Sequence, residues 1–208
     1  MRIVGGKFRG RKLFEPRGRQ ITRPTTDRVR EACSSALLSA LPHGFDSISV
    51  LDAFSGSGAF GLEMISRGAG HATFYDIDRS AIKLIRKNIE SLQVDSREAT
   101  SINGDVIQAA NRGYMVGSPF DVVILDPPYA FGTQPIECLL HAMDKNKLLK
   151  TDAIILFERS DKTPQLVVSQ FDNLREKRYG STNVDILKYS PRQLDNESSM
   201  VVFEETSN

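Results

Sequence analysis

Short apolar runs alternate with helical patterns along the chain from residue 48 onward. Apolar or alternating runs predict strands over residues 48–54, 72–75, 100–103, 120–125 and 153–157. Apolar residues at helical spacing predict helices ending near Arg67, starting after Asp78, and over residues 106–111 and 134–143. Repeated β-α units build a parallel sheet with helices on both faces. The pattern therefore predicts a doubly wound, Rossmann-like α/β fold.

The two ends of the chain depart from this alternation. Residues 173–179 and 183–189 predict two strands around a glycine, which would add an antiparallel part to the sheet. Residues 2–15 predict a basic β-hairpin, and an amphipathic helix follows from about residue 26 to 41. We expect residues 1–44 to form one unit with an α/β domain of residues 45–190, and residues 191–208 to be a tail.

Positive charge is concentrated near the N-terminus. Residues 1–30 contain ten Lys/Arg and two Asp/Glu, whereas the remaining residues contain 17 and 24. Such a concentration is typical of a surface that binds a polyanion, although a solvated terminus would show the same charge. Phe8, Leu13 and Phe14 are interleaved with the basic residues, which favours an ordered binding segment.

The remaining composition excludes several classes of protein. Cys33 and Cys138 lie far apart, without a CxxC pair or a nearby histidine cluster, so the sequence indicates neither a disulfide nor a metal site. No apolar run approaches the roughly 18 residues that a membrane span needs. The first residues also lack the apolar core of a signal peptide. We expect a cytoplasmic protein without a metal or a membrane partner.

A glycine-rich turn follows the first strand of the α/β part. Gly56, Gly58 and Gly61 form a G-x-G-x-x-G sequence that leads into a helix. Glycines there allow a sharp turn and close approach of a ligand to the helix N-terminus. Asp76 ends the next strand, where a carboxylate can accept hydrogen bonds from both ribose hydroxyls. This order favours a nucleotide cofactor over a turn that only packs a helix on a strand.

Two further aspartates favour S-adenosylmethionine over NAD. Asp52 precedes the glycines, where it can meet the ammonium group of a methionine moiety but would repel a pyrophosphate. Asp105 can accept a hydrogen bond from an adenine amine, cap the following helix, or do both, and the backbone of Val106 can contact the ring edge. The predicted cofactor site comprises Asp52, Phe54, Gly56, Ser57, Gly58, Gly61, Asp76, Ile77, Asp105 and Val106.

The sequence Asp-Pro-Pro-Tyr follows the buried strand of residues 120–125. Its two prolines end the strand in a rigid loop at the carboxyl edge of the sheet, where such sheets bind ligands. An exocyclic nucleobase amine could donate to the Asp126 carboxylate and the Pro127 carbonyl, while Tyr129 stacks on the base. Glu158, at the end of the fifth strand, could also touch the substrate. The predicted catalytic residues are Asp126, Pro127, Pro128 and Tyr129.

The motif D-x-F-x-G-x-G at residues 52–58 followed by D-P-P-Y resembles amino-methyltransferases that act on nucleic acid bases. Residues 2–13, 23–31 and 66–69 resemble more specifically the bacterial RsmD family, and this resemblance extends from residue 1 to about 189. Members of that family methylate the N2 amine of one guanine in 16S ribosomal RNA. The resemblance implies a class I S-adenosylmethionine-dependent methyltransferase fold with that activity.

The same resemblance implies roles for the N-terminal residues. Arg23, Thr25 and Thr26 would close over the methionine end of the cofactor. The hairpin and the start of the helix would bind RNA through Lys7, Arg9, Arg11, Lys12 and Arg28. The family usually has Glu where this chain has Asp76, which shortens the reach to the ribose. The implied partner is 16S rRNA or a small-subunit assembly particle, bound by a monomer.

Other functions remain open on the sequence alone. A DNA adenine amino-methyltransferase shares D-P-P-Y but normally carries a sizeable target-recognition domain, which is not visible here. A non-catalytic RNA-binding or assembly protein could retain the fold, although the four intact aspartates at 52, 76, 105 and 126 argue against it. A dehydrogenase would need an acid or base on the hydride side, and the sequence offers no obvious one.

Overall fold

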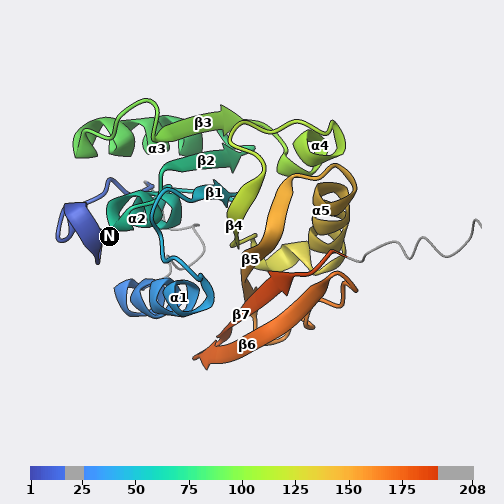
Figure 1. Ribbon diagram of the computed structural model, residues 1–208. Helices are drawn as coiled ribbons and strands as arrows, with labels where there is room; N and C mark the ends of the chain where they lie inside the picture. The colour runs from blue at the N-terminus through green and yellow to red at the C-terminus, as the bar shows by residue number, and fades with distance from the viewer. Residues whose placement is uncertain (17–25, 192–208) are drawn as a thin grey trace, which may run out of the picture.

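A seven-stranded sheet runs through the molecule in the order β3-β2-β1-β4-β5-β7-β6 (Figure 1). The structure, a computed structural model, describes residues 1–16 and 26–191. Strands β1 to β5 are parallel, whereas β7 runs antiparallel to both β5 and β6. The strands are β1 Ser49–Asp52, β2 His71–Asp76, β3 Ala99–Asn103, β4 Phe120–Leu125, β5 Leu149–Ser160, β6 Phe171–Tyr179 and β7 Thr182–Tyr189.

Helices cover both faces of this sheet. They are α1 Asp27–Ala40, α2 Ala59–Arg67, α3 Arg79–Leu92, α4 Val106–Asn111 and α5 Gln134–Lys145, with 3-10 turns η1 Gly6–Phe8 and η2 Tyr129–Phe131. In β4, Val122 and Ile124 join the core under α1, α2 and α3. Val123 and Leu125 join the core under α4 and α5. Because side chains alternate along a strand, an unbroken apolar run supplies both cores at once.

The predicted Rossmann-like α/β fold and the antiparallel C-terminal part are both confirmed. The first predicted strand is shorter than expected, because the chain leaves β1 after Asp52 and begins the glycine turn. The fifth is longer, because β5 pairs with β4 on one side and β7 on the other. The predicted helix start at Asp78 is also confirmed, since its carboxylate accepts a hydrogen bond from the backbone N–H of Ser80 at 2.8 Å.

The N-terminal segment folds back on itself beside α2 (Figure 1). Its two arms share one isolated antiparallel bridge, between Arg2 and Lys12, in place of the ladder that a regular hairpin would have. The fully buried carboxylate of Glu63 in α2 accepts hydrogen bonds from the backbone N–H groups of Val4 and Gly5, each at 2.8 Å. A buried carboxylate with such partners stabilises the docked segment, since removing it would leave those donors unsatisfied.

The return arm is fixed to α3 in the same way. The side-chain amide of Asn88, fully buried, accepts from the backbone N–H of Phe14 at 2.7 Å and donates to the Ser57 carbonyl at 2.9 Å. The segment therefore lies along two helices and reaches the glycine turn that follows β1. Within residues 1–16 and 26–191, no helix combines the length and apolar character that crossing a membrane requires.

Candidate functional site

A pocket of about 350 Å³ opens at the carboxyl ends of the parallel strands. It lies where the strand order reverses, with β3 and β2 on one side of β1 and β4 and β5 on the other. Open α/β sheets bind ligands at such a switch point. The predicted residues that line this pocket are Asp52, Phe54, Gly56, Ser57, Asp76, Ile77, Asp105, Val106, Asp126, Pro127 and Pro128.

The three glycines of the turn have two different roles: one lines the pocket, and the other two allow close packing. Gly56 lines the pocket with a φ of 53°, a left-handed conformation that favours glycine. Gly58 is the N-cap of α2, and a Cβ atom at Gly61 would lie 2.3 Å from the ring of Phe74 in β2. The structure therefore places Gly58 and Gly61 behind the pocket wall, where they allow α2 to pack closely on the sheet.

Asp52 is buried at the end of β1 and accepts a hydrogen bond from the backbone N–H of Gly61 at 3.0 Å. Burial raises the pKa of this carboxyl from 3.8 to about 7, and the negative charge of Asp76 adds to the increase, while the Gly61 hydrogen bond opposes it. A buried carboxylate becomes easier to ionise when a cation approaches. Asp52 is thus suited to a positively charged ligand group.

Asp76 and Asp105 are both held by backbone donors at the pocket edge. Asp76 accepts from the N–H of Gly56 at 2.9 Å and from that of Asp78 at 2.8 Å, which fixes its carboxylate beside the glycine turn. Asp105 caps α4 by accepting from Ile107 at 2.8 Å. The capping role considered for Asp105 is confirmed, and because Asp105 also lines the pocket, a ligand contact is compatible with it.

Two acidic residues follow the last residues at which β4 and β5 pair, and the predicted strand end at Glu158 is corrected because β5 continues to Ser160 beside β7. Leu125 of β4 is in register with Phe157 of β5, and the next residues along the two chains are Asp126 and Glu158. Both line the pocket, and Glu158 is buried with 4% of its surface exposed. A possible substrate contact was predicted for Glu158 from its position after the apolar run of the fifth strand, and its place in the pocket agrees with that prediction.

An aromatic pair forms another part of the wall. The rings of Phe54 and Phe131 meet edge to face, with their centroids 5.4 Å apart, and both residues line the pocket. Phe131 belongs to the 3-10 turn η2, which Tyr129 begins. Sequence reasoning overlooked Phe131, although its position two residues after Tyr129 was visible. The stacking role of Tyr129 stays a prediction.

The N-terminal segment and α1 complete the enclosure. Met1, Pro16 and Arg30 line the pocket, and sequence reasoning assigned none of them to the site. Arg30 is almost fully buried and donates to the carbonyl of Arg2 at 2.6 Å. Thr26 caps α1 and accepts from the Val29 N–H at 3.3 Å, so it lies at the helix start and is not among the lining residues described. Arg23 and Thr25 lie outside the residues that the structure describes.

Two of the predicted RNA-binding residues are bonded to the α/β domain. Lys7 forms an ion pair with Glu98 at 2.5 Å, and Arg11 donates to the carbonyls of Ser91 and Leu92 at the end of α3. Ser91 lies three residues after Asn88, the α3 residue that donates to the carbonyl of the pocket-lining Ser57, so Arg11 is held about one helical turn beyond that contact.

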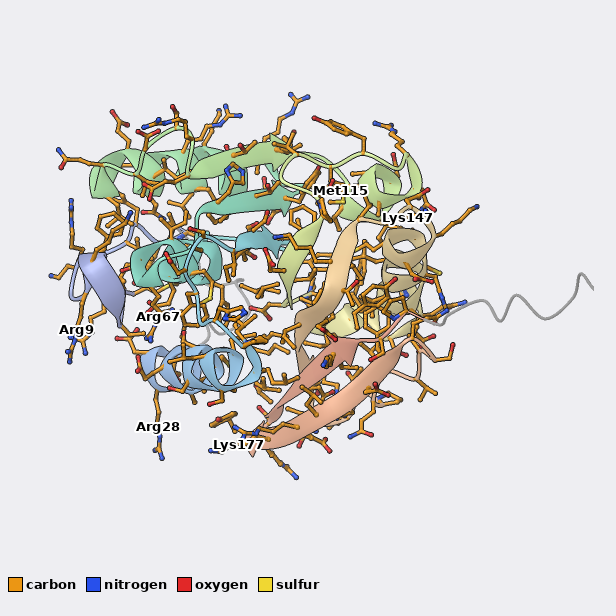
Figure 2. The ribbon with its side chains drawn as sticks, in the orientation of Figure 1. Arg9, Arg28, Arg67, Met115, Lys147 and Lys177 are labelled. Atoms are coloured by element: carbon orange, nitrogen blue, oxygen red, sulfur yellow. The ribbon has the colours of Figure 1, made fainter. Side chains whose placement is uncertain are left out.

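Three predicted RNA-binding residues keep their charges exposed. Arg9, Lys12 and Arg28 form no ion pair with any residue in the described part of the chain. Figure 2 shows Arg9 and Arg28 pointing outward from the molecule. Lys7 and Arg11, in contrast, are bonded to the domain, Lys7 to Glu98 just before β3 and Arg11 to the end of α3, so any contact of theirs with RNA would compete with these bonds.

Comparisons with known proteins agree with this geometry. Residues 1–188 match the family described as Conserved hypothetical protein 95. Ribosomal RNA small subunit methyltransferase D of Haemophilus influenzae is 34% identical over 184 residues, which cover 86% of this chain and 89% of that protein. The solved structure of Escherichia coli yhhF has a TM-score of 0.76 at 30% identity, and the match covers 92% of this chain and 99% of that chain.

A more distant structure supports the fold alone. Magnesium protoporphyrin IX methyltransferase from Synechocystis PCC 6803, solved with bound S-adenosylmethionine, has a TM-score of 0.60 at 15% identity, covering 78% of this chain and 79% of that chain. The α/β sheet with its antiparallel C-terminal hairpin is thus a methyltransferase fold. The match over residues 1–188 shows that the chain belongs to the family described as Conserved hypothetical protein 95, and its relatives include proteins named ribosomal RNA small subunit methyltransferase D.

Proposed function

We propose that this protein transfers a methyl group from S-adenosylmethionine to the N2 amine of one guanine in 16S rRNA. The observation that carries the proposal is that the Asp126-Pro127 loop and the glycine turn with Asp76 line one pocket. A methyl donor and an amine acceptor could therefore meet there. The relatives named small-subunit rRNA methyltransferases support RNA as the substrate.

We assign three pocket aspartates to parts of the cofactor. Asp76 would accept hydrogen bonds from the ribose hydroxyls, and Asp105 from the adenine amine. Asp52 would face the ammonium group of the methionine moiety. The bound cofactor supplies an activated methyl group on a sulfonium. The roles implied for Arg23, Thr25 and Thr26, which would close over the methionine end, belong to the same proposal.

Asp126 and Pro127 would make the amine reactive. The lone pair of an exocyclic amine is delocalised into the base, so the amine is a weak nucleophile until its hydrogens are bound. The Asp126 carboxylate and the Pro127 carbonyl would each accept one N–H, which localises the lone pair and points it at the methyl group. The proton released after transfer would pass to Asp126 or to water.

The position of Glu158 favours guanine over adenine and cytosine. The N2 amine of guanine is adjacent to an N1–H donor, whereas the exocyclic amines of adenine and cytosine are adjacent to a ring nitrogen that accepts. A carboxylate next to Asp126 would bind the N1–H of guanine and repel an acceptor at that position. A glutamate buried at 4% exposure beside the catalytic loop therefore fits a guanine N2 acceptor.

The N-terminal region would deliver the RNA. We assign RNA contacts to residues 1–44 and the transfer chemistry to residues 45–190, in a monomer. The exposed cations of Arg9, Lys12 and Arg28 would bind phosphates.

Methyl transfer to defined nucleic acids tests the substrate class. Purified protein is incubated with methyl-labelled S-adenosylmethionine and, in separate reactions, small ribosomal subunits, free 16S rRNA or DNA. We expect label in the rRNA of subunits or of free rRNA, and nuclease digestion followed by mass analysis should give N2-methylguanosine. Label only in DNA, or only on adenine, contradicts the proposal.

The raised pKa of Asp52 predicts that cofactor binding weakens in mild acid. In the free protein the Asp52 carboxyl has a pKa of about 7, and the ammonium group of the cofactor requires its ionised form. Below pH 7 binding must expel a proton, so we expect Kd to rise by up to about tenfold per pH unit between pH 7 and 5.5.

Titration calorimetry in that range measures this dependence. The Asp52→Asn variant, which has no ionisable group at that position, should bind the cofactor more weakly and with little change between pH 7 and 5.5. An unchanged slope in Asp52→Asn would assign the titration to another group.

A further inference from the structure

A second cavity, of about 180 Å³, lies between α1 and the β6–β7 hairpin. Ala32 and Ser35 contribute to its α1 wall, and Arg175, Lys177 and Tyr179 form the β6 wall. We propose that this α1–β6 groove binds the sugar-phosphate backbone of the RNA strand that flanks the target base. The inference rests on the proposed function and adds the path by which the RNA reaches the pocket.

The charge of the groove fits a row of phosphates. Arg175 and Lys177 are exposed, and neither forms an ion pair with any residue in the ranges 1–16 and 26–191. They are two positions apart in β6, after the irregularity at residues 173–175, so both point to the same face about 7 Å apart. This separation is similar to that between consecutive phosphates along one strand of RNA.

The α1 side of the groove carries a third cation. Arg28 lies one helical turn before Ala32 and two turns before Ser35, so the three residues share one stripe of α1. Figure 2 shows Arg28 and Lys177 along the same lower edge of the molecule, near α1 and the end of β6. Arg28, Arg175 and Lys177 therefore place positive charge on both sides of the groove.

The groove begins next to the catalytic pocket. Cys33 lines the groove, and Arg30, three residues earlier in α1, lines the pocket, so the two lining residues are separated by about 4.5 Å along the helix axis. Val184 of the groove is in register with Glu158 of the pocket. Burial raises the pKa of the Cys33 thiol, and so do the negative charges of Glu158 and Asp126, consistent with this proximity.

A strand whose base enters the pocket can therefore continue directly into the groove. The phosphates next to the target nucleotide would lie near Arg175 and Lys177, and the ring of Tyr179 offers an apolar surface in the same wall. Arg11 of the N-terminal segment contacts the end of α3, whereas the groove lies between α1 and β6. The two basic regions would thus contact different parts of the RNA.

Charge on β6 also has a purely structural explanation. β6 is the outer strand of the sheet, and charged side chains on an edge strand prevent pairing with the edge of another molecule. That role depends on charge but not on its sign. Replacing Arg175 and Lys177 by glutamate keeps the edge charged and reverses only the attraction to phosphate, so the double variant separates the two explanations.

The test compares Arg175→Glu/Lys177→Glu with wild-type protein, using the rRNA substrate that the wild type methylates. We expect RNA Kd and KM to rise at least about tenfold at low salt, and the slope of log Kd against log salt to fall by about 2. Cofactor affinity, the unfolding midpoint and the monomeric state in gel filtration should stay unchanged. The matched control is Arg112→Glu/Lys145→Glu, which makes the same charge change at exposed positions near α4 and α5.

The outcomes are distinct. If the β6 variant binds RNA with wild-type affinity and wild-type salt dependence, the proposed RNA contact at the groove is wrong. It is also wrong if the control variant loses as much affinity as the β6 variant, because the loss would then follow net charge alone. If the β6 variant self-associates while its monomer binds RNA as the wild type does, the edge-strand explanation is supported and the proposed RNA contact at the groove is wrong. If the wild-type protein does not methylate rRNA, the proposed function is refuted. This outcome is measured on the wild type alone, so it is distinct from a failure of the groove.

Discussion

Replacing Asp126 with alanine is expected to lower the rate constant of methyl transfer by about three orders of magnitude, the scale for removing a group that stabilises the transition state. The variant loses the carboxylate that would accept an N–H of the target amine, so the lone pair of the amine stays delocalised in the base. Single-turnover transfer of labelled methyl to the rRNA substrate measures this loss directly.

Asp126→Asn provides a graded control. The amide oxygen can still accept a hydrogen bond but lacks the negative charge, so we expect an intermediate loss of about 10- to 100-fold, since charge-assisted hydrogen bonds are roughly twice as strong as neutral ones. Cofactor Kd should change little in either variant, because the proposed cofactor contacts come from β1, β2 and the turn before α4. Turnover by Asp126→Ala at the wild-type rate would contradict the role given to this residue.

Glu158→Gln is expected to change which base is accepted. In the wild type, Glu158 would accept the N1–H of guanine, and we expect the uncharged variant to lose about 10- to 100-fold in kcat/KM on the guanine substrate, the scale of one charge-assisted hydrogen bond. Cofactor affinity should be retained.

A substrate with 2-aminopurine at the target position isolates the N1–H contact. 2-Aminopurine keeps the amine at position 2 but has an acceptor at N1. The wild type should therefore discriminate strongly against it, whereas the glutamine of Glu158→Gln can donate to that acceptor and should reduce the discrimination. If the wild type methylated both bases with equal kcat/KM, Glu158 would have no part in reading the base.

Anchoring of the N-terminal segment shows why several site residues were missed in the sequence. Met1 lines the pocket because two distant side chains, Glu63 and Asn88, hold its segment against α2 and α3. Each of these contacts joins residues more than 50 positions apart. Periodicity describes neighbours within one element, so it cannot show which elements will meet.

Local patterns in the sequence alone determined where several strands and helices begin and end. The run Val122–Leu125 predicted a buried strand because both of its faces are apolar, and the prolines after Asp126 predicted its end because they lack an N–H. Asp78 predicted a helix start because its side chain can reach the next free N–H groups. The G-x-G-x-x-G turn and D-P-P-Y predicted the ends of strands at which a ligand site would lie.

Only the tertiary structure decided how these pieces combine. The strand order brought Glu158 beside Asp126, because β5 pairs with β4 in a register that no short-range signal specifies. Packing assigned Gly61 to the contact with Phe74, although its motif suggested a ligand. The N-terminal segment docks along α3, so Arg11 contacts the end of that helix. The pairing of β6 with β7 places Arg175 and Lys177 opposite α1. Charge and chemistry can be read from the sequence, but their distances depend on which surfaces pack together.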